Sequence, residues 1–151
     1  MSTPELYKEY PVILNTGSRV VNFFHSEHRQ IKSLRNMEPY PMAELNPETG
    51  KKYGIKDGDW IWIENQFGKA KFKARFREGH MKDLVMVQHS WWLPEKGPET
   101  LYGVFDANVN LLIPNDVYSK TGYGGSHMKS VLCKVYPAES GIEGIYEGGE
   151  A

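Results

Sequence analysis

The sequence has one cysteine, almost no net charge and no long apolar run, and each shortage excludes a class of protein. Cys133 alone cannot form a disulfide or a thiolate metal cluster within the chain. A formal net charge of −1 over 151 residues argues against nucleic-acid binding, which usually needs a basic face. Because no apolar run approaches the roughly 18 residues of a membrane span, we expect no membrane contact by this chain.

Common enzyme signatures are also missing. The sequence contains no G-x-S-x-G, Walker A or G-x-G-x-x-G pattern, so the usual hydrolase and nucleotide-binding motifs do not apply. The N-terminus lacks an apolar signal core, although a parent protein could carry one upstream. The compartment, cytoplasmic or periplasmic, therefore depends on the parent protein.

The chain divides into three parts by composition. Residues 1–11 are polar with two prolines and predict a linker or arm, whereas residues 138–151 predict an acidic, flexible tail. Between them, residues 12–137 contain short strand-like runs, and residues 69–76 alternate charged with apolar side chains. Further strands are predicted at 12–14, 60–64, 84–87 and 130–136. Together with long loops, this pattern predicts a mainly β fold with short helices, a small barrel.

Two local patterns predict structure in detail. Asn46 is a good N-cap and Pro47 suits the first helical position, so a short helix should begin there despite the cost of Gly50. In the turn Gly58-Asp59, the aspartate should accept backbone hydrogen bonds while the glycine takes positive φ. A second, longer helix is permitted over residues 24–36.

A local excess of positive charge marks residues 19–36, with four basic residues against one glutamate. The segment follows the turn Thr16-Gly17-Ser18, whose backbone N–H groups and hydroxyls could meet a phosphate beside Arg19 or Arg29. The alternative is a solvated basic helix face, which is what most charge runs are.

The histidines and tryptophans leave alternatives open. His25 and His28 form an H-x-x-H pair, which is weak evidence for a metal site without further ligands. Trp91 and Trp92 could wall a heterocycle, but tandem tryptophans are more often core residues. Cys133 lies in an alternating strand and is predicted to be a core residue.

Several segments in order resemble one family. They are Thr16-Gly17-Ser18-Arg19, Phe24-His25-Ser26, Asn46-Pro47-Glu48, 54–59, His89-Ser90-Trp91-Trp92, Asn108-Val109-Asn110, Thr121-Gly122 and 132–136. The set resembles the molybdopterin-dinucleotide-binding C-terminal domain of the dimethyl sulfoxide reductase family of molybdenum and tungsten oxidoreductases. Three departures from the family pattern are Gly50 for alanine, Ser90 for glycine and Ile113-Pro114 for a threonine-bearing turn.

The resemblance implies a six-stranded double-psi β-barrel that closes over a bis(pyranopterin guanine dinucleotide) cofactor. The Thr16 turn would approach the pterin or its pyrophosphate, and Trp91 and Asn110 would border the cleft. The residues that it assigns to the cofactor are Thr16, Gly17, Ser18, Arg19, His25, Arg29, His89, Trp91, Asn110, Tyr123, Gly124 and Lys129.

The sequence thus predicts a binding module that holds and orients molybdopterin guanine dinucleotide, with Mo or W held mainly by other domains. No turnover is expected from the chain alone, and its partners would be the remaining domains of the catalytic subunit or a larger subunit. Two alternatives are a double-psi barrel that recruits proteins without a cofactor, and a small metalloenzyme that uses His25, His28 and another histidine.

Overall fold

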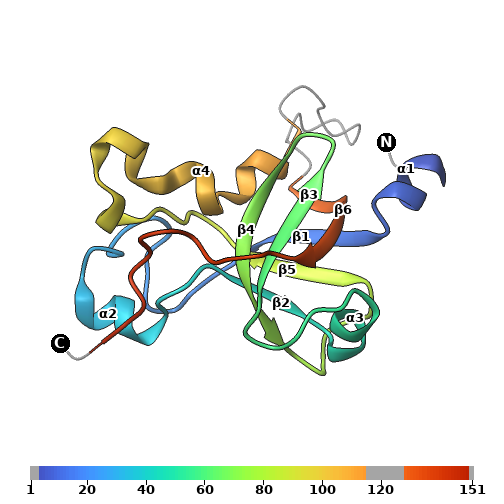
Figure 1. Ribbon diagram of the computed structural model, residues 1–151, viewed down its shortest axis with the longest axis horizontal. Helices are drawn as coiled ribbons and strands as arrows, with labels where there is room; N and C mark the ends of the chain where they lie inside the picture. Colours follow the sequence, from blue (N-terminus) through green and yellow to red (C-terminus); the bar gives the residue numbers. More distant parts are fainter. Residues whose placement is uncertain (1–3, 115–127, 150–151) are drawn as a thin grey trace.

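Six strands form a closed barrel in the computed structural model, which describes residues 4–114 and 128–149 (Figure 1). The strands are β1 (Val12–Ser18), β2 (Met42–Leu45), β3 (Trp60–Asn65), β4 (Gly68–Phe76), β5 (Leu84–Gln88) and β6 (Lys129–Pro137). Their order around the barrel is β1-β5-β2-β4-β3-β6. β1 pairs with β5, and β2 with β4, in parallel; the other described pairs are antiparallel. The predicted mainly β, six-stranded barrel of the double-psi type is confirmed.

The alternation in β4 explains how the barrel core forms. Ala70, Phe72 and Ala74 are buried inside, while the basic residues between them lie on the outer face. The equivalent inward positions of the other strands complete one apolar core, to which Cys133 belongs, as predicted. Burial raises the pKa of the Cys133 thiol well above its usual range.

The helices are short and lie outside the barrel. They are α1 (Pro4–Glu9), α2 (Lys32–Met37), α3 (Pro47–Lys52) and α4 (Val104–Ala107), with 3₁₀ turns η1 (Pro94–Lys96), η2 (Pro98–Gly103) and η3 (Val109–Leu112). The predicted cap of α3 is confirmed, since Asn46 Oδ1 accepts a hydrogen bond from the Glu48 N–H at 2.9 Å. The helix permitted over 24–36 is much shorter, because His25 and His28 take φ values of 54° and 74°, which interrupt a helix.

Glycine at position 50 has a packing reason. A Cβ built on Gly50 would lie 2.2 Å from Cζ of Phe76, so the phenyl ring occupies the space of the missing methyl group. The predicted turn at Gly58-Asp59 is also confirmed, with φ of 84° at Gly58 and a 2.8 Å hydrogen bond from the Lys56 N–H to Asp59 Oδ2.

The C-terminal segment packs against the rest of the chain, where the sequence predicted a flexible tail. After β6 it crosses the barrel and ends beside α2 (Figure 1). Ile142 is buried in a second apolar cluster, and the Tyr146 hydroxyl donates to Asn36 Oδ1 at 2.6 Å. Lys71 Nζ also donates to the Gly141 carbonyl at 2.9 Å. Composition alone missed these anchors because their partners lie far away in the sequence.

Candidate functional site

Two loops from distant parts of the sequence meet because β1 and β5 are parallel neighbours. Ser18 pairs with Gln88 at the carboxyl ends of these strands, so residues 16–19 (the β1 loop) and 89–92 (the β5 loop) leave the barrel at the same edge. The register shifts between Thr16 and Ser18, and Gly17 takes a φ of +91° there. Thr16 Oγ1 donates to the Met128 carbonyl at 2.6 Å, which ties the β1 loop to the start of β6.

His25 and His89 join the two loops. His25 Nδ1 lies 3.0 Å from His89 Nε2, and His89 Nδ1 lies 3.3 Å from the Ser18 carbonyl oxygen. A carbonyl only accepts, so His89 Nδ1 carries the proton; in the neutral pair His89 Nε2 then accepts from His25 Nδ1. This chain of bonds leaves the lone pair on Nε2 of His25, an exposed residue, for a ligand.

Arg29 supports the β5 loop and the backbone at His25. Its Nη2 donates to the carbonyls of His25 and His89 at 3.1 and 3.2 Å, and its Nε donates to the Ser90 carbonyl at 3.1 Å. The guanidinium lies 4.4 Å from the ring centroid of Phe23 and 4.2 Å from that of Trp91. Arg29 is only 2% exposed, and burial, with a smaller effect of nearby Arg35, lowers its pKa to about 10.

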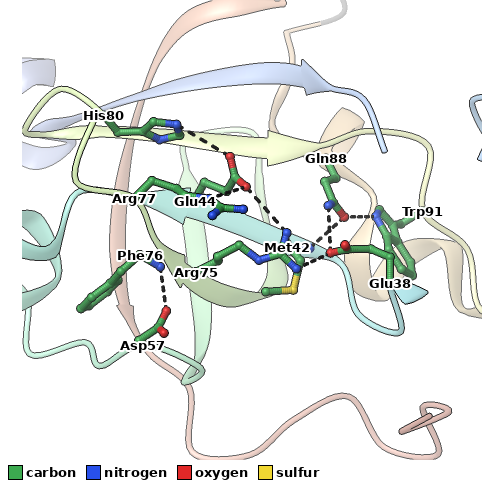
Figure 2. Close-up of polar contacts among 10 residues, drawn as sticks. All are labelled: Glu38, Met42, Glu44, Asp57, Arg75, Phe76, Arg77, His80, Gln88 and Trp91. Carbon is green, nitrogen blue, oxygen red and sulfur yellow. Dashed lines mark hydrogen bonds and ion pairs between the residues drawn. The ribbon is translucent and has the colours of Figure 1, made fainter. Parts of the chain in front are cut away.

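Trp91 lies behind the loops, not at their surface. The residue is 2% exposed, and its Nε1 donates to Oε1 of buried Gln88 at 2.8 Å. The same Oε1 accepts from the Met42 N–H at 3.1 Å, and the Gln88 amide donates to Glu38 Oε1 at 3.2 Å. Figure 2 shows Gln88 between Trp91 and Glu38, so the indole is fixed by a chain of buried polar contacts.

The chain of contacts continues over the outside of β2 and β4. Arg75 Nη2 donates to Glu38 Oε1 at 2.6 Å, and its Nη1 lies 3.7 Å from Glu44 Oε1. Arg77 and His80 face the same Glu44 carboxylate at 3.3 and 3.7 Å (Figure 2). These contacts fix the position of the Glu38 carboxylate, which in turn accepts the hydrogen bond from Gln88.

The other residues predicted to contact the cofactor make fewer contacts with the two loops. Arg19 is exposed on the β1 loop, and Lys129 is exposed at the start of β6, where it pairs with Asn15. Asn110 is exposed in η3, which Asn65 anchors to the β3–β4 hairpin through a 2.8 Å hydrogen bond to the Leu112 carbonyl. Among the described residues, Asn110 makes no hydrogen bond to the β1 loop; its N–H donates to Asn108 Oδ1 at 2.9 Å. The predictions for Tyr123, Gly124 and the Thr121-Gly122 motif lie outside the described residues.

The structure therefore brings the Thr16–Arg19 turn, His25, Arg29 and His89 together and gives Arg29 and Trp91 supporting positions. Their predicted contacts with a cofactor stay predictions. Sequence reasoning missed Gln88 and Phe23, which hold Trp91 and Arg29. The one signal for Gln88 was a polar residue at the end of an apolar strand run.

A histidine metal site finds no support in the described part of the chain. No group of three or more His, Cys, Asp or Glu side chains there is placed to hold a metal ion. Nδ1 of His25 is directed to His89, while His28 Nε2 lies 4.0 Å from its neighbour Glu27. Across residues 4–114 and 128–149, no helix is long and apolar enough to cross a membrane.

The molecule is thus a closed six-stranded barrel whose polar loops converge at one edge. The family model described as the molydopterin dinucleotide binding domain matches residues 12–131. The chain belongs to this family, which confirms the resemblance to the dimethyl sulfoxide reductase group and implies a molybdopterin cofactor.

Relatives within the group are much longer than this chain. Dopamine dehydroxylase of Eggerthella lenta is 39% identical over 132 residues, which make up 87% of this chain and 13% of that protein. Acetylene hydratase of Syntrophotalea acetylenica is 39% identical over 102 residues, 66% of this chain and 14% of that protein. The solved acetylene hydratase structure from Pelobacter acetylenicus matches with a TM-score of 0.83 at 33% identity, over 89% of this chain and 19% of the other.

Proposed function

We propose that this chain binds and orients a bis(pyranopterin guanine dinucleotide) cofactor of Mo or W within a larger anaerobic oxidoreductase. It would act as the C-terminal domain of the catalytic subunit or as a separate small subunit, and would not turn over alone. The observation that carries the proposal is the convergence of the β1 and β5 loops, with His25 and His89, at one edge of the barrel.

The residues at this edge fit a large anionic ligand. A Cβ built on Gly17 would meet nothing within 4 Å among the described residues, so the backbone is open to close approach. Arg19 and Lys129 are exposed nearby and can approach phosphate oxygens. His25 offers an exposed ring nitrogen that accepts a hydrogen bond when neutral and donates one when protonated.

When bound, the cofactor would supply a metal dithiolene centre for redox chemistry. The residues of this chain would bind and position it. Arg29 fixes the backbone of the β5 loop and of His25 through their carbonyls, so these residues keep one arrangement beside the β1 loop. Buried Trp91 packs against Phe23 and the Arg29 guanidinium below the loops.

Exposed apolar side chains beside the β1 loop support a place within a larger protein. Val21 is 98% exposed and Phe24 is 62% exposed, immediately after the loop. A contiguous exposed apolar patch beside a polar site commonly marks a protein contact. We infer that other domains of the parent protein cover them and supply the other half of the cofactor cleft.

The same apolar residues would suit the alternative function, a barrel that recruits proteins without a cofactor. The two functions differ in their need for Arg19, whose charge only an anionic ligand would require. In the full-length parent enzyme, Arg19→Ala should weaken cofactor retention by about tenfold, the value of one charge-assisted hydrogen bond. Molybdenum or tungsten content and released guanine nucleotide, measured after dialysis, report the retention.

A matched control is Lys51→Ala, which removes one positive charge from the exposed end of α3. It should leave cofactor content unchanged. If Arg19→Ala also retains full cofactor content, Arg19 does not bind the anion; if the intact parent enzyme contains no pterin at all, the recruitment function is favoured.

A further inference from the structure

An exposed apolar surface lies on the turn η2 and the start of α4, outside the barrel strands (Figure 1). Leu101 is 58% exposed, Tyr102 is 41% exposed and Phe105 is 62% exposed. We call these three residues the η2 ridge. Large apolar side chains that gather on one short exposed segment commonly mark a contact with another molecule.

The backbone of the η2 ridge is held in a strained conformation. Leu101 and Tyr102 take φ values of 51° and 54°, and Gly103 follows at 62°. Only the glycine adopts this left-handed conformation freely, because the Cβ of the other two residues is crowded by the backbone. Both of these side chains are exposed, so their packing within this chain does not offset the strain. Strain of this kind is concentrated at binding and catalytic segments of proteins.

Hydrogen bonds around the η2 ridge fix the strained conformation. The Leu93 N–H donates to the Tyr102 carbonyl at 2.7 Å, and the Tyr102 N–H donates to the Gly97 carbonyl at 2.8 Å. Lys96 Nζ donates to Asp106 Oδ2 at 2.9 Å and joins η1 to α4. A ridge that is already rigid loses little conformational entropy when it docks, so this arrangement suits a binding surface.

The charges of the ridge segment indicate what kind of partner it fits. The two elements η2 and α4 contain no basic residue, and their acidic residues are Glu99 and Asp106. Asp106 is paired with Lys96 of η1. Phosphate groups of a lipid or a nucleic acid would find no cation in these elements, so the partner that fits the ridge is an apolar protein surface.

The ridge is connected to the edge where the β1 and β5 loops meet. The rings of Trp92 and Tyr102 are in edge-to-face contact, with their centroids 5.7 Å apart. Trp92 Nε1 donates to the Ser26 carbonyl, two residues after exposed Phe24. Trp92 therefore links the η2 ridge to the exposed apolar residues that follow the β1 loop.

We propose that the η2 ridge is a docking surface for the rest of the parent protein, which covers it with a complementary apolar surface. Relatives supply the reason for this occupant. The ridge lies within residues 12–131, which the family model matches, and the part of the solved acetylene hydratase that matches this chain is 19% of that protein. Most of such a protein lies outside this domain and can cover the ridge. The proposal rests on the proposed function only in needing a larger protein; it needs no contact between the ridge and the cofactor.

Hydroxyl-radical footprinting, which measures the exposure of individual side chains, tests the proposal. In the 151-residue chain, Leu101, Tyr102 and Phe105 should be oxidised readily. In the full-length parent enzyme they should be oxidised about fivefold more slowly, because side chains at the centre of an interface are desolvated. Oxidation at the same rate in the parent enzyme would overturn the proposal.

A charge at position 105 separates docking from folding. Phe105→Glu should leave urea unfolding of the 151-residue chain unchanged, since the side chain is exposed, but should lower the midpoint of thermal unfolding of the parent enzyme. Phe105→Leu keeps an apolar side chain and should leave the parent midpoint near that of the wild type. The matched control is Met81→Glu, because Met81 is 73% exposed in the loop before β5, and it should leave the midpoint unchanged. Equal losses from Phe105→Glu and Met81→Glu would contradict a specific interface at the ridge.

Two measurements on the same samples distinguish the other outcomes. If analytical ultracentrifugation shows a dimer of the 151-residue chain with a protected ridge, and the ridge stays exposed in the parent enzyme, the occupant is a second copy and the proposal is wrong. Pterin content of the parent enzyme tests the proposed function separately. A protected ridge without pterin would refute cofactor binding alone, and an exposed ridge with full pterin content would refute docking alone.

Discussion

Replacing Gly50 with alanine sets two opposing effects against each other. Alanine is favoured over glycine inside a helix by about 1 kcal/mol. Against this, the new methyl group would lie 2.2 Å from Cζ and 2.6 Å from Cε1 of Phe76, so the ring must leave its place. Overpacking of this kind typically costs about 1–3 kcal/mol. The steric term is the larger one, and Gly50→Ala should lower the free energy of unfolding by about 1 kcal/mol.

Urea unfolding, followed by circular dichroism, measures this change, and a second background separates the two effects. Phe76→Leu removes the ring, so Gly50→Ala should become neutral or slightly stabilising there. A 3.1 Å approach to the Ile55 carbonyl remains in that background and limits the gain. The double variant should therefore lose less stability than the sum of the two single variants. If Gly50→Ala stabilises the wild-type chain, the packing explanation for this glycine is wrong.

Three further predictions concern the core, the barrel wall and the support of the β5 loop. Burial raises the pKa of the Cys133 thiol, so a thiol reagent at about pH 8 should label the folded chain far more slowly than the chain in urea; equal rates would contradict this. The hydrogen bond from the Tyr136 hydroxyl lowers the pKa of the Glu64 carboxyl in the folded state. The stabilisation from this interaction is therefore complete above the ordinary pKa of 4.5 and is lost as the pH falls through the lowered pKa of the folded state. Urea unfolding should show a flatter acid limb of the stability–pH profile for Glu64→Gln, and an unchanged limb would refute the assignment. Gln88→Leu removes the acceptor shared by Trp91 Nε1 and the Met42 N–H, so urea unfolding should show a loss of about 2 kcal/mol or more in stability, and an unchanged stability would contradict this role.

Local patterns in the sequence were enough to predict much of the barrel. The alternation over residues 69–76 predicted a strand with one buried face, and β4 has that face. Asn46 and Pro47 predicted the start of α3, because a helix cap depends on neighbouring residues alone. The order of weak motifs then identified the family, although no single motif could.

The other features of the site depend on contacts between residues far apart in the sequence, and local patterns do not reveal such contacts. The helix permitted over 24–36 is broken where His25 bonds to His89, 64 residues away. Arg29 lies in a charged segment of the kind that is usually exposed, yet it is buried because the carbonyls of His25, His89 and Ser90 converge on its guanidinium. Position 90 takes a φ of 61°, a left-handed conformation that glycine adopts without strain, so the serine that departs from the family pattern there is strained.

The anchored C-terminal segment changes where this domain ends as a folding unit. A boundary drawn at the last strand would stop at Pro137 and discard Ile142, which fills the second apolar cluster together with Trp91. It would also discard Tyr146, whose hydroxyl donates a hydrogen bond to Asn36 of α2. Shortened versions of the protein made for crystallography or domain exchange should therefore run to at least Gly149, whose carbonyl accepts a hydrogen bond from Asn36.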